Sequence, residues 1–180
     1  IERPERSDAY WLAGVGTPLR VQLRKMASSE EELDAMLDTY RDYNLEHHDE
    51  MAKPYPGIIE VVKTLHQNEA KLGLVTSKLS RGANRGVRLL GLEDALAVRV
   101  CADDVVQGKP HPEPVLKALA ALDASPAEAV FIGDSEHDIE AGRRAGVETA
   151  AVSWGPFARE TLEAAGPSYF IERPEQVFDL

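Results

Sequence analysis

The apolar positions of the chain follow a helical period up to about residue 53 and a different pattern beyond it. In the first part they recur at the spacing of one helix face, which predicts helices over 7–12, 19–26 and 29–51. The third of these begins with Ser29 followed by three glutamates, the pattern of a capping box with acids in the first turn. We therefore expect residues 1–53 to form a small helical unit.

Beyond this unit, helical stretches alternate with apolar runs that are too short for helices and are typical of buried strands. The predicted helices span 57–67, 82–90, 112–122, 138–145 and 157–165, with a last one from residue 174, and the predicted strands span 71–76, 96–101, 129–132, 149–152 and 168–171. Regular alternation with short loops predicts an α/β fold in which a parallel sheet carries helices on both faces. Two prolines and a glycine at 53–57 mark a boundary, so we expect a second unit over 54–180.

Composition and charge narrow the class of protein. The 180 residues are 43% hydrophobic, enough for a real core, and the net charge of −11 with no stripe of Lys and Arg argues against nucleic acid as the partner. No apolar run approaches membrane-spanning length, so we expect no membrane partner. The single cysteine, Cys101, lies in an apolar run and is expected to be a buried structural thiol in a cytoplasmic protein.

The stretch from Val130 to Gly146 carries the first candidate chemistry. A short apolar run ends at Gly133, and Asp134 follows at the carboxyl edge of the sheet, where open α/β folds place ligands. Asp138 comes four residues later, at the start of a helical pattern. Two carboxylates at one sheet edge suit Mg²⁺, although both could instead cap the helix.

Two further strand ends carry polar groups. The strand before Thr76, Ser77 and Lys78 brings two hydroxyls and an ammonium to the same sheet edge, where the hydroxyls could hydrogen-bond a phosphoryl oxygen or simply cap the next helix. Lys109 lies in a Gly-Lys-Pro-His-Pro turn before a helix, where it could clamp a phosphate or remain a solvated loop lysine. The order of hydroxyl, lysine and acid pair on successive strands favours a phosphate site.

Together these stretches closely resemble motifs II, III and IV of the haloacid dehalogenase-like hydrolases, in particular the phosphoglycolate phosphatase-like branch. The matching stretches are 72–78, 108–112 and 131–138, and the resemblance extends over residues 1–180, with 1–53 similar to the α-helical cap of that branch. The resemblance implies a Rossmann-like parallel sheet with a small α-helical cap. It also implies a Mg²⁺-dependent phosphatase of a small phosphorylated metabolite, such as a phosphoglycolate-like compound, a sugar phosphate or pyrophosphate.

The resemblance also assigns roles to individual residues. Thr76 would hydrogen-bond the transferring phosphoryl group, and Lys109 would offset negative charge on the nucleophile and the phosphate. Asp134 would bind Mg²⁺, and Asp138 would hold a metal-bound water or support the site. In such enzymes an aspartate attacks phosphorus and water then hydrolyses the aspartyl-phosphate.

The chain departs from the family pattern in one respect. The first motif, a strand followed by Asp-x-Asp-Gly-Thr, is absent from these 180 residues, so we expect the nucleophile to lie in a segment that precedes residue 1. Without that strand, two strands of the sheet would have unpaired edges, and the chain alone would be inactive.

Substrate recognition is expected from the helical unit and from the residues after motif II. The turn at 14–18 contains Thr17 and is followed by Arg20, which could meet a substrate carboxylate or second phosphate, or could be an ordinary surface arginine. Ser77 and Lys78 are the other candidates for substrate binding. We expect a small-molecule phosphate ester as the partner and a monomer or homodimer.

Three alternatives remain open. A phosphosugar mutase of the same family would return the phosphoryl group instead of releasing it. A receiver-like signalling domain also surrounds an aspartate with acids, a hydroxyl and a lysine, although it lacks a helical unit of this kind. A non-catalytic binding domain is the third alternative.

Overall fold

The computed structural model describes residues 6–7, 10–11, 14–15 and 17–180. Its helices are α2 (Leu19–Arg24), α3 (Glu30–Met51), α4 (Ile58–Gln67), α5 (Ser80–Leu89), α6 (Glu113–Leu122), α7 (Glu136–Ala145) and α8 (Arg159–Ala164), with short 3₁₀ turns η1 (Ala102–Asp104), η2 (Pro126–Glu128) and η3 (Pro174–Asp179). Its strands are β1 (Gly73–Val75), β2 (Val98–Val100), β3 (Val130–Gly133), β4 (Glu148–Val152) and β5 (Tyr169–Ile171). The predicted α/β class is confirmed, while half of the residues of the helix predicted over 7–12 lie outside the described residues.

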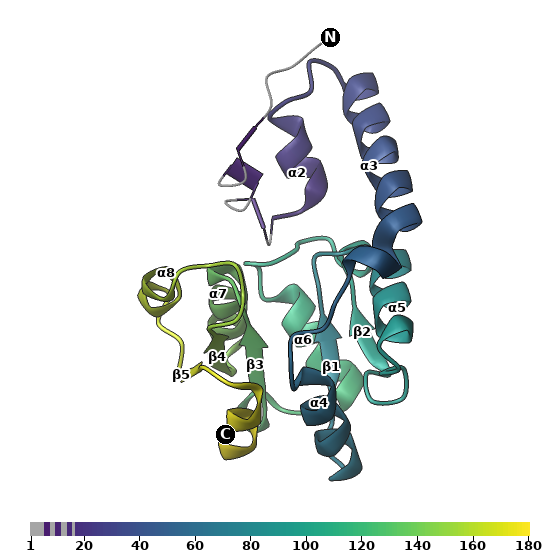
Figure 1. The fold of residues 1–180 in the computed structure, drawn as a ribbon. Coiled ribbons are helices and arrows are strands. Elements are labelled where there is room, and N and C mark those ends of the chain that lie inside the picture. Colours follow the sequence, from purple (N-terminus) through teal and green to yellow (C-terminus); the bar gives the residue numbers. More distant parts are fainter. Residues whose placement is uncertain (1–5, 8–9, 12–13, 16) are drawn as a thin grey trace.

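The helices α2 and α3 stand together above the α/β part of the molecule (Figure 1). Leu23 of α2 packs against Leu33 and Leu37 of α3, and all three side chains are buried. The expected capping of α3 is present, since the Ser29 side chain accepts a hydrogen bond from the Glu32 N–H at 3.2 Å. These two helices therefore have an apolar core of their own.

The strands form two parallel sheets rather than the single sheet that the sequence predicts. One contains β1 and β2, and the other contains β3, β4 and β5 in that order. In Figure 1, β1 and β3 are the neighbouring strands of the two sheets, yet no ladder joins them in the described part of the chain. The expected unpaired edges are therefore present, because each of these two strands hydrogen-bonds a strand on one side only.

Helix packing joins the two sheets. The helix α6 contacts β1 and β2, and α7 contacts β3 and β4. The two helices also contact each other through an apolar cluster whose buried members are Val115, Leu119, Ala141, Ala145 and Val147. A further contact is made between α4 and η3.

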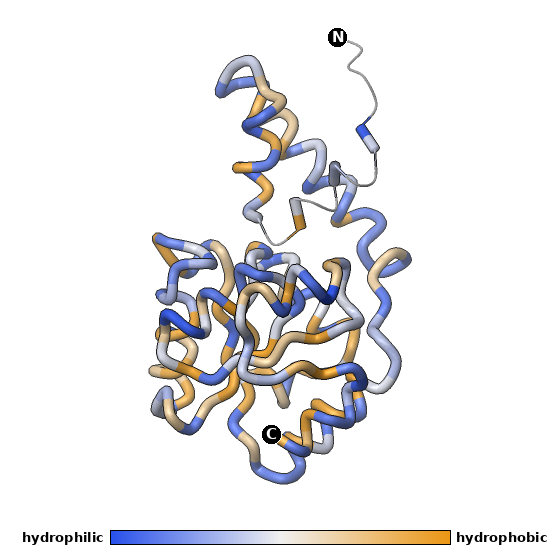
Figure 2. The backbone as a smooth tube through the Cα atoms, turned by 90° about the vertical axis from the view of Figure 1, so that its left-hand side faces the viewer, coloured by the Kyte–Doolittle hydropathy of each residue, from blue (hydrophilic) through white to orange (hydrophobic). Residues whose placement is uncertain are grey.

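The core of the three-stranded sheet is built from small and branched residues on both faces of β4. Ala151 packs with Ile139 and Leu162 on one face, and Ala150 packs with Val152 and Ile171. In Figure 2, hydrophobic stretches of the backbone, drawn in orange, run through the lower part of the molecule. Of the helices in the described ranges, none is both long enough and apolar enough to cross a membrane.

Candidate active site

The turn from β3 to α7 fixes the two aspartates that the sequence singles out. Ser135 is the N-cap of α7: its Oγ accepts from the Asp138 N–H at 3.3 Å, while its own N–H donates to Asp138 Oδ2 at 3.1 Å. Ser135 Oγ also donates to Asp138 Oδ2 at 2.6 Å. This reciprocal capping box, which the sequence analysis did not identify here, locks the position of Asp138.

Asp138 also binds Lys109. The Lys109 Nζ lies 2.6 Å from Asp138 Oδ1, and the two side chains are only 11% and 7% exposed. Both oxygens of Asp138 are therefore engaged within the protein, one by Ser135 and the other by Lys109. Of the two roles that the resemblance implies for Asp138, this arrangement favours support of the site over holding a metal-bound water.

Asp134 is half-buried at the end of β3. Burial raises the pKa of its carboxyl group, the negative charge of Asp138 raises the pKa further, and the ammonium of Lys109 lowers it. Two carboxylates thus share one lysine, which leaves an excess of negative charge at the site.

Two glycines make room for the aspartates. A Cβ atom on Gly155, in the loop after β4, would lie 2.3 Å from Asp134 Cβ, and a Cβ on Gly133 would lie 2.2 Å from Asp138 Cβ. Neither distance is compatible with a side chain at the glycine unless the backbone or the aspartate shifts. Local sequence gives no sign of the contact of Gly155 with Asp134, because this contact joins the loops after two different strands.

Thr76, Ser77 and Lys109 line one pocket of about 160 Å³. Thr76 follows β1, and its Oγ1 accepts a hydrogen bond from the Lys78 N–H at 3.2 Å. Pro18, directly before α2, lines the same pocket from the helical unit. The volume is below the roughly 300 Å³ of the smallest drug-sized sites. Neither Asp134 nor Asp138 is among the residues that line this pocket.

The loop that carries Lys109 is held by a glutamate. Glu113, in the first turn of α6, accepts hydrogen bonds from the N–H groups of Val106 and Gln107 at 2.8 and 2.9 Å. These two bonds lower the pKa of the Glu113 carboxyl. Lys109 therefore projects from an anchored loop, as the surrounding prolines suggest.

The structure places the remaining candidates elsewhere. Lys78 lines a second pocket beside His48 and Lys53 rather than the pocket of Thr76 and Ser77. Arg20 binds Glu30 and Asp34 of α3, each at 2.8 Å, so its guanidinium ties α2 to α3.

Thr17 is next to Pro18, and its backbone carbonyl accepts from Gln22 Nε2 at 2.8 Å. It does not line the pocket itself. None of Thr17, Arg20 and Lys78 lines this pocket, although Pro18 and Ser77, next to Thr17 and Lys78 in the sequence, do. The substrate-binding role of the three residues stays a prediction.

The charge and chemistry of the site fit Mg²⁺. This ion prefers oxygen ligands and usually takes one or two protein carboxylates, with waters and phosphate oxygens completing its shell. Asp134 is a half-buried carboxylate whose pKa is raised by burial and by Asp138, so a nearby cation would stabilise its ionised form. Asp134 is thus the residue that would hold the ion.

Cys101 and its neighbours form a different kind of cluster. Cys101 lies within reach of Asp103 and Asp104, but Asp104 accepts from the Cys101 N–H at 2.8 Å and Asp103 accepts from the Ser80 N–H at 2.8 Å. The thiol is buried, and burial raises its pKa, so the expectation of a structural cysteine is confirmed.

The chain is similar in sequence to known proteins over most of its length. A family model described as haloacid dehalogenase-like hydrolase matches residues 2–152. The chain is also 40% identical over 169 residues to the pyrophosphatase PpaX of Anoxybacillus flavithermus, covering 94% of this chain and 78% of that protein.

Solved structures share the fold. A protein of Lactobacillus plantarum, provisionally assigned as a phosphoglycolate phosphatase, matches with a TM-score of 0.86 and 26% identity, covering 98% of this chain and 83% of its own. A protein of Thermotoga maritima, provisionally assigned as a β-phosphoglucomutase, matches with a TM-score of 0.77 and 28% identity over 98% of this chain and 83% of its own.

Proposed function

Because the chain belongs to the haloacid dehalogenase-like hydrolases, we propose that it is the greater part of a Mg²⁺-dependent phosphatase that acts on a small phosphorylated compound. One observation carries this proposal. Thr76, Ser77 and Lys109 line one small pocket, and the ammonium of Lys109 lies 2.6 Å from Asp138 beside the half-buried Asp134.

The residues of the site have complementary tasks in this proposal. The hydroxyls of Thr76 and Ser77 donate hydrogen bonds to phosphoryl oxygens, and Lys109 offsets the negative charge that gathers there. Asp138 keeps Lys109 at the site through their ion pair. Asp134 would hold Mg²⁺, which would supply further positive charge at the phosphoryl group.

We propose that the attacking carboxylate is an aspartate on a strand that lies between β1 and β3. Two features support this placement. Each of these strands is unpaired on one side, and the two are neighbours in Figure 1. A strand there would end at the same sheet edge as Thr76 and Asp134, because parallel strands place their carboxyl ends together.

Pyrophosphate is the first substrate to test. The proposal of pyrophosphate rests on the similarity to a protein named pyrophosphatase, and small phosphomonoesters such as phosphoglycolate are the alternative. The pocket beneath Pro18 is small, which favours a compact substrate over one with a large leaving group.

The test is an assay of the full-length protein for phosphate release. Pyrophosphate, phosphoglycolate and sugar phosphates are compared, with Mg²⁺ and with a chelator, for the parent protein, for Asp134→Asn and for a control, Asp94→Asn. Asp94 is an exposed aspartate remote in sequence from all three motifs. We expect Mg²⁺-dependent release that Asp134→Asn reduces at least 100-fold and that Asp94→Asn retains. Equal turnover in parent and Asp134→Asn would remove Asp134 from the metal role.

The same panel separates hydrolysis from transfer. A phosphosugar mutase would convert one sugar phosphate into another with little phosphate release, a possibility raised by the similarity to the protein of Thermotoga maritima. Isomerisation of a sugar phosphate without release would replace the phosphatase proposal with the mutase.

A further inference from the structure

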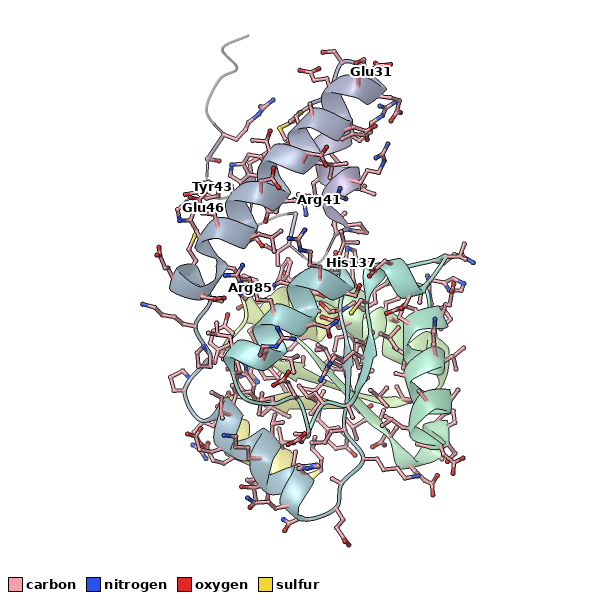
Figure 3. All side chains as sticks on the ribbon, turned by 90° about the vertical axis from the view of Figure 1, so that its right-hand side faces the viewer. Glu31, Arg41, Tyr43, Glu46, Arg85 and His137 are labelled. Carbon is pink, nitrogen blue, oxygen red and sulfur yellow. The ribbon has the colours of Figure 1, made fainter. Side chains whose placement is uncertain are left out.

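The helical unit and the α/β unit meet where the last turns of α3 lie against α5. Arg85 projects from α5 toward α3, as Figure 3 shows. Its Nε donates to Asp49 Oδ1 at 2.8 Å and its Nη2 donates to Asp49 Oδ2 at 2.9 Å, while Nη1 donates to the Leu45 carbonyl. One guanidinium thus binds α3 at two successive turns.

Asp49 also contacts His48, its neighbour in α3, through the same Oδ1 that accepts from Arg85 Nε. The Nδ1 of His48 lies 2.9 Å from Asp49 Oδ1, and the imidazole is only 3% exposed. The ring faces the backbone of Gly86 on α5, where a Cβ atom would lie 3.7 Å from His48 Nε2. The carboxylate therefore contacts both a buried ring and a bidentate arginine. Hydrogen bonds from Arg85 and His48 lower the Asp49 pKa to about 2, so this group is ionised at neutral pH.

The contact of Arg85 with α3 lies at one end of a long helix. The helix α3 has 22 residues, so it is about 33 Å long. It meets α5 near its C-terminal end only, while α2 is tied to the other end of α3 through Arg20. A rotation of α3 about this contact consequently moves α2 as well, together with Pro18, which covers the pocket of Thr76 and Lys109.

We propose that Arg85 is a positioning residue whose bidentate contact with Asp49 sets the tilt of α3 and so seats Pro18 over the pocket. A planar guanidinium binds both carboxylate oxygens and fixes direction as well as distance, whereas a lysine ammonium fixes distance alone. The bond to the Leu45 carbonyl adds a third point of attachment on the same helix.

The test follows the tilt through the distance between two spin labels, measured by double electron–electron resonance. The labels are attached at Glu31→Cys, near the free end of α3, and at Glu160→Cys on the surface of α8. Buried Cys101, with its raised pKa, is expected to react slowly with the label. The label distances are measured in the parent chain and in Arg85→Met, Arg85→Lys and Asp49→Asn.

Arg88→Met is the matched control. Arg88 lies on the same helix one turn later, its side chain is 75% exposed, and it pairs with Glu93 instead of α3. We expect one narrow distance distribution for the parent and for Arg88→Met. We expect a shifted or broadened distribution for Arg85→Met and Asp49→Asn, and an intermediate one for Arg85→Lys.

Two results would overturn the proposal. One is a parent-like distribution in both Arg85→Met and Asp49→Asn. The other is a double variant that is much broader than either single one, because the two residues would then act separately. Circular dichroism of each variant checks that it is folded. If Arg85→Met is not folded, the isosteric variant Asp49→Asn decides the test. The measurement uses no substrate, so its failure would leave the proposed phosphatase activity untouched.

Discussion

Replacing Lys109 by methionine tests the electrostatic balance of the site. The substitution keeps most of the side-chain volume and removes the charge that lies 2.6 Å from Asp138 Oδ1. Asp138 is 7% exposed in its side chain, so its carboxylate would remain largely out of contact with water and next to the negative Asp134. The variant should therefore be destabilised even though it loses no apolar contact area.

The magnitude follows from the burial of the pair. Removing one partner of a buried ion pair costs about 3–5 kcal/mol, because the remaining charge is uncompensated. Ser135 still donates two hydrogen bonds to Asp138, so we expect the lower end, about 3 kcal/mol, for Lys109→Met. Adding Asp138→Asn removes the stranded charge and should restore most of this loss. The restoration should be incomplete, because Lys109 also lies 5.8 Å from the Phe131 ring centroid, a cation–π contact of about 0.5–1 kcal/mol.

Urea unfolding followed by circular dichroism, at pH 7 with a chelator present, measures these changes. Lys63→Met, at an exposed lysine of α4, is the control and should change the free energy of unfolding by less than about 0.5 kcal/mol. A loss below about 1 kcal/mol for Lys109→Met, or a double variant no more stable than the single one, would refute the reasoning.

Three further predictions follow from the same geometry. Because the pKa of Asp134 is raised in the folded protein, its protonated form favours folding, and this contribution is lost as pH rises through the folded pKa. Differential scanning fluorimetry at pH 7 should therefore show that Asp134→Asn melts at a higher temperature than the metal-free parent and gains no stability from Mg²⁺. Gly155→Ala should keep the fold but raise at least 10-fold the Mg²⁺ concentration that is needed to stabilise the protein. Gly82→Ala, where a Cβ meets no atom within 4 Å, should leave this concentration unchanged. The Asp49 pKa is lowered from 3.8 to about 2, so the ionised carboxylate stabilises the folded protein. In urea unfolding, the difference in stability between the parent and Asp49→Asn should be constant above pH 5 and should disappear as pH falls from about 4 toward 2.

The sequence predicted those parts of the site that depend on strand ends. Thr76, Ser77 and Lys109 line one pocket because parallel strands bring their carboxyl ends to one edge, a rule that needs only the order of elements. Lys78 follows Ser77 directly but faces the second pocket, because the chain turns away from the site there. Local sequence does not reveal which neighbour in such a turn points inward.

Other features depended on partners far along the chain. Arg20 binds Glu30 and Asp34 rather than facing the pocket, and this preference appears only once α2 and α3 pack. Gly155 is required beside Asp134, although 21 positions separate them in the sequence. The strands were predicted in the right order, but their ends were not exact. The predictions for β1, β2 and β5 were too long, β4 begins one residue before its predicted start, and β3 is shifted by one residue.

The link between the two sheets has a consequence for how the molecule opens. Within the described ranges, which do not include the strand proposed between β1 and β3, no peptide hydrogen bonds join these two strands. The two halves are linked by side chains of α6 and α7, by α4 and η3, and by the ion pair of Lys109 with Asp138. Replacing Leu119 by alanine would thus loosen one half from the other and leave every backbone ladder intact. Amide protons of β1 and of β4 would then exchange with solvent in two separate events, each half behaving as its own cooperative unit.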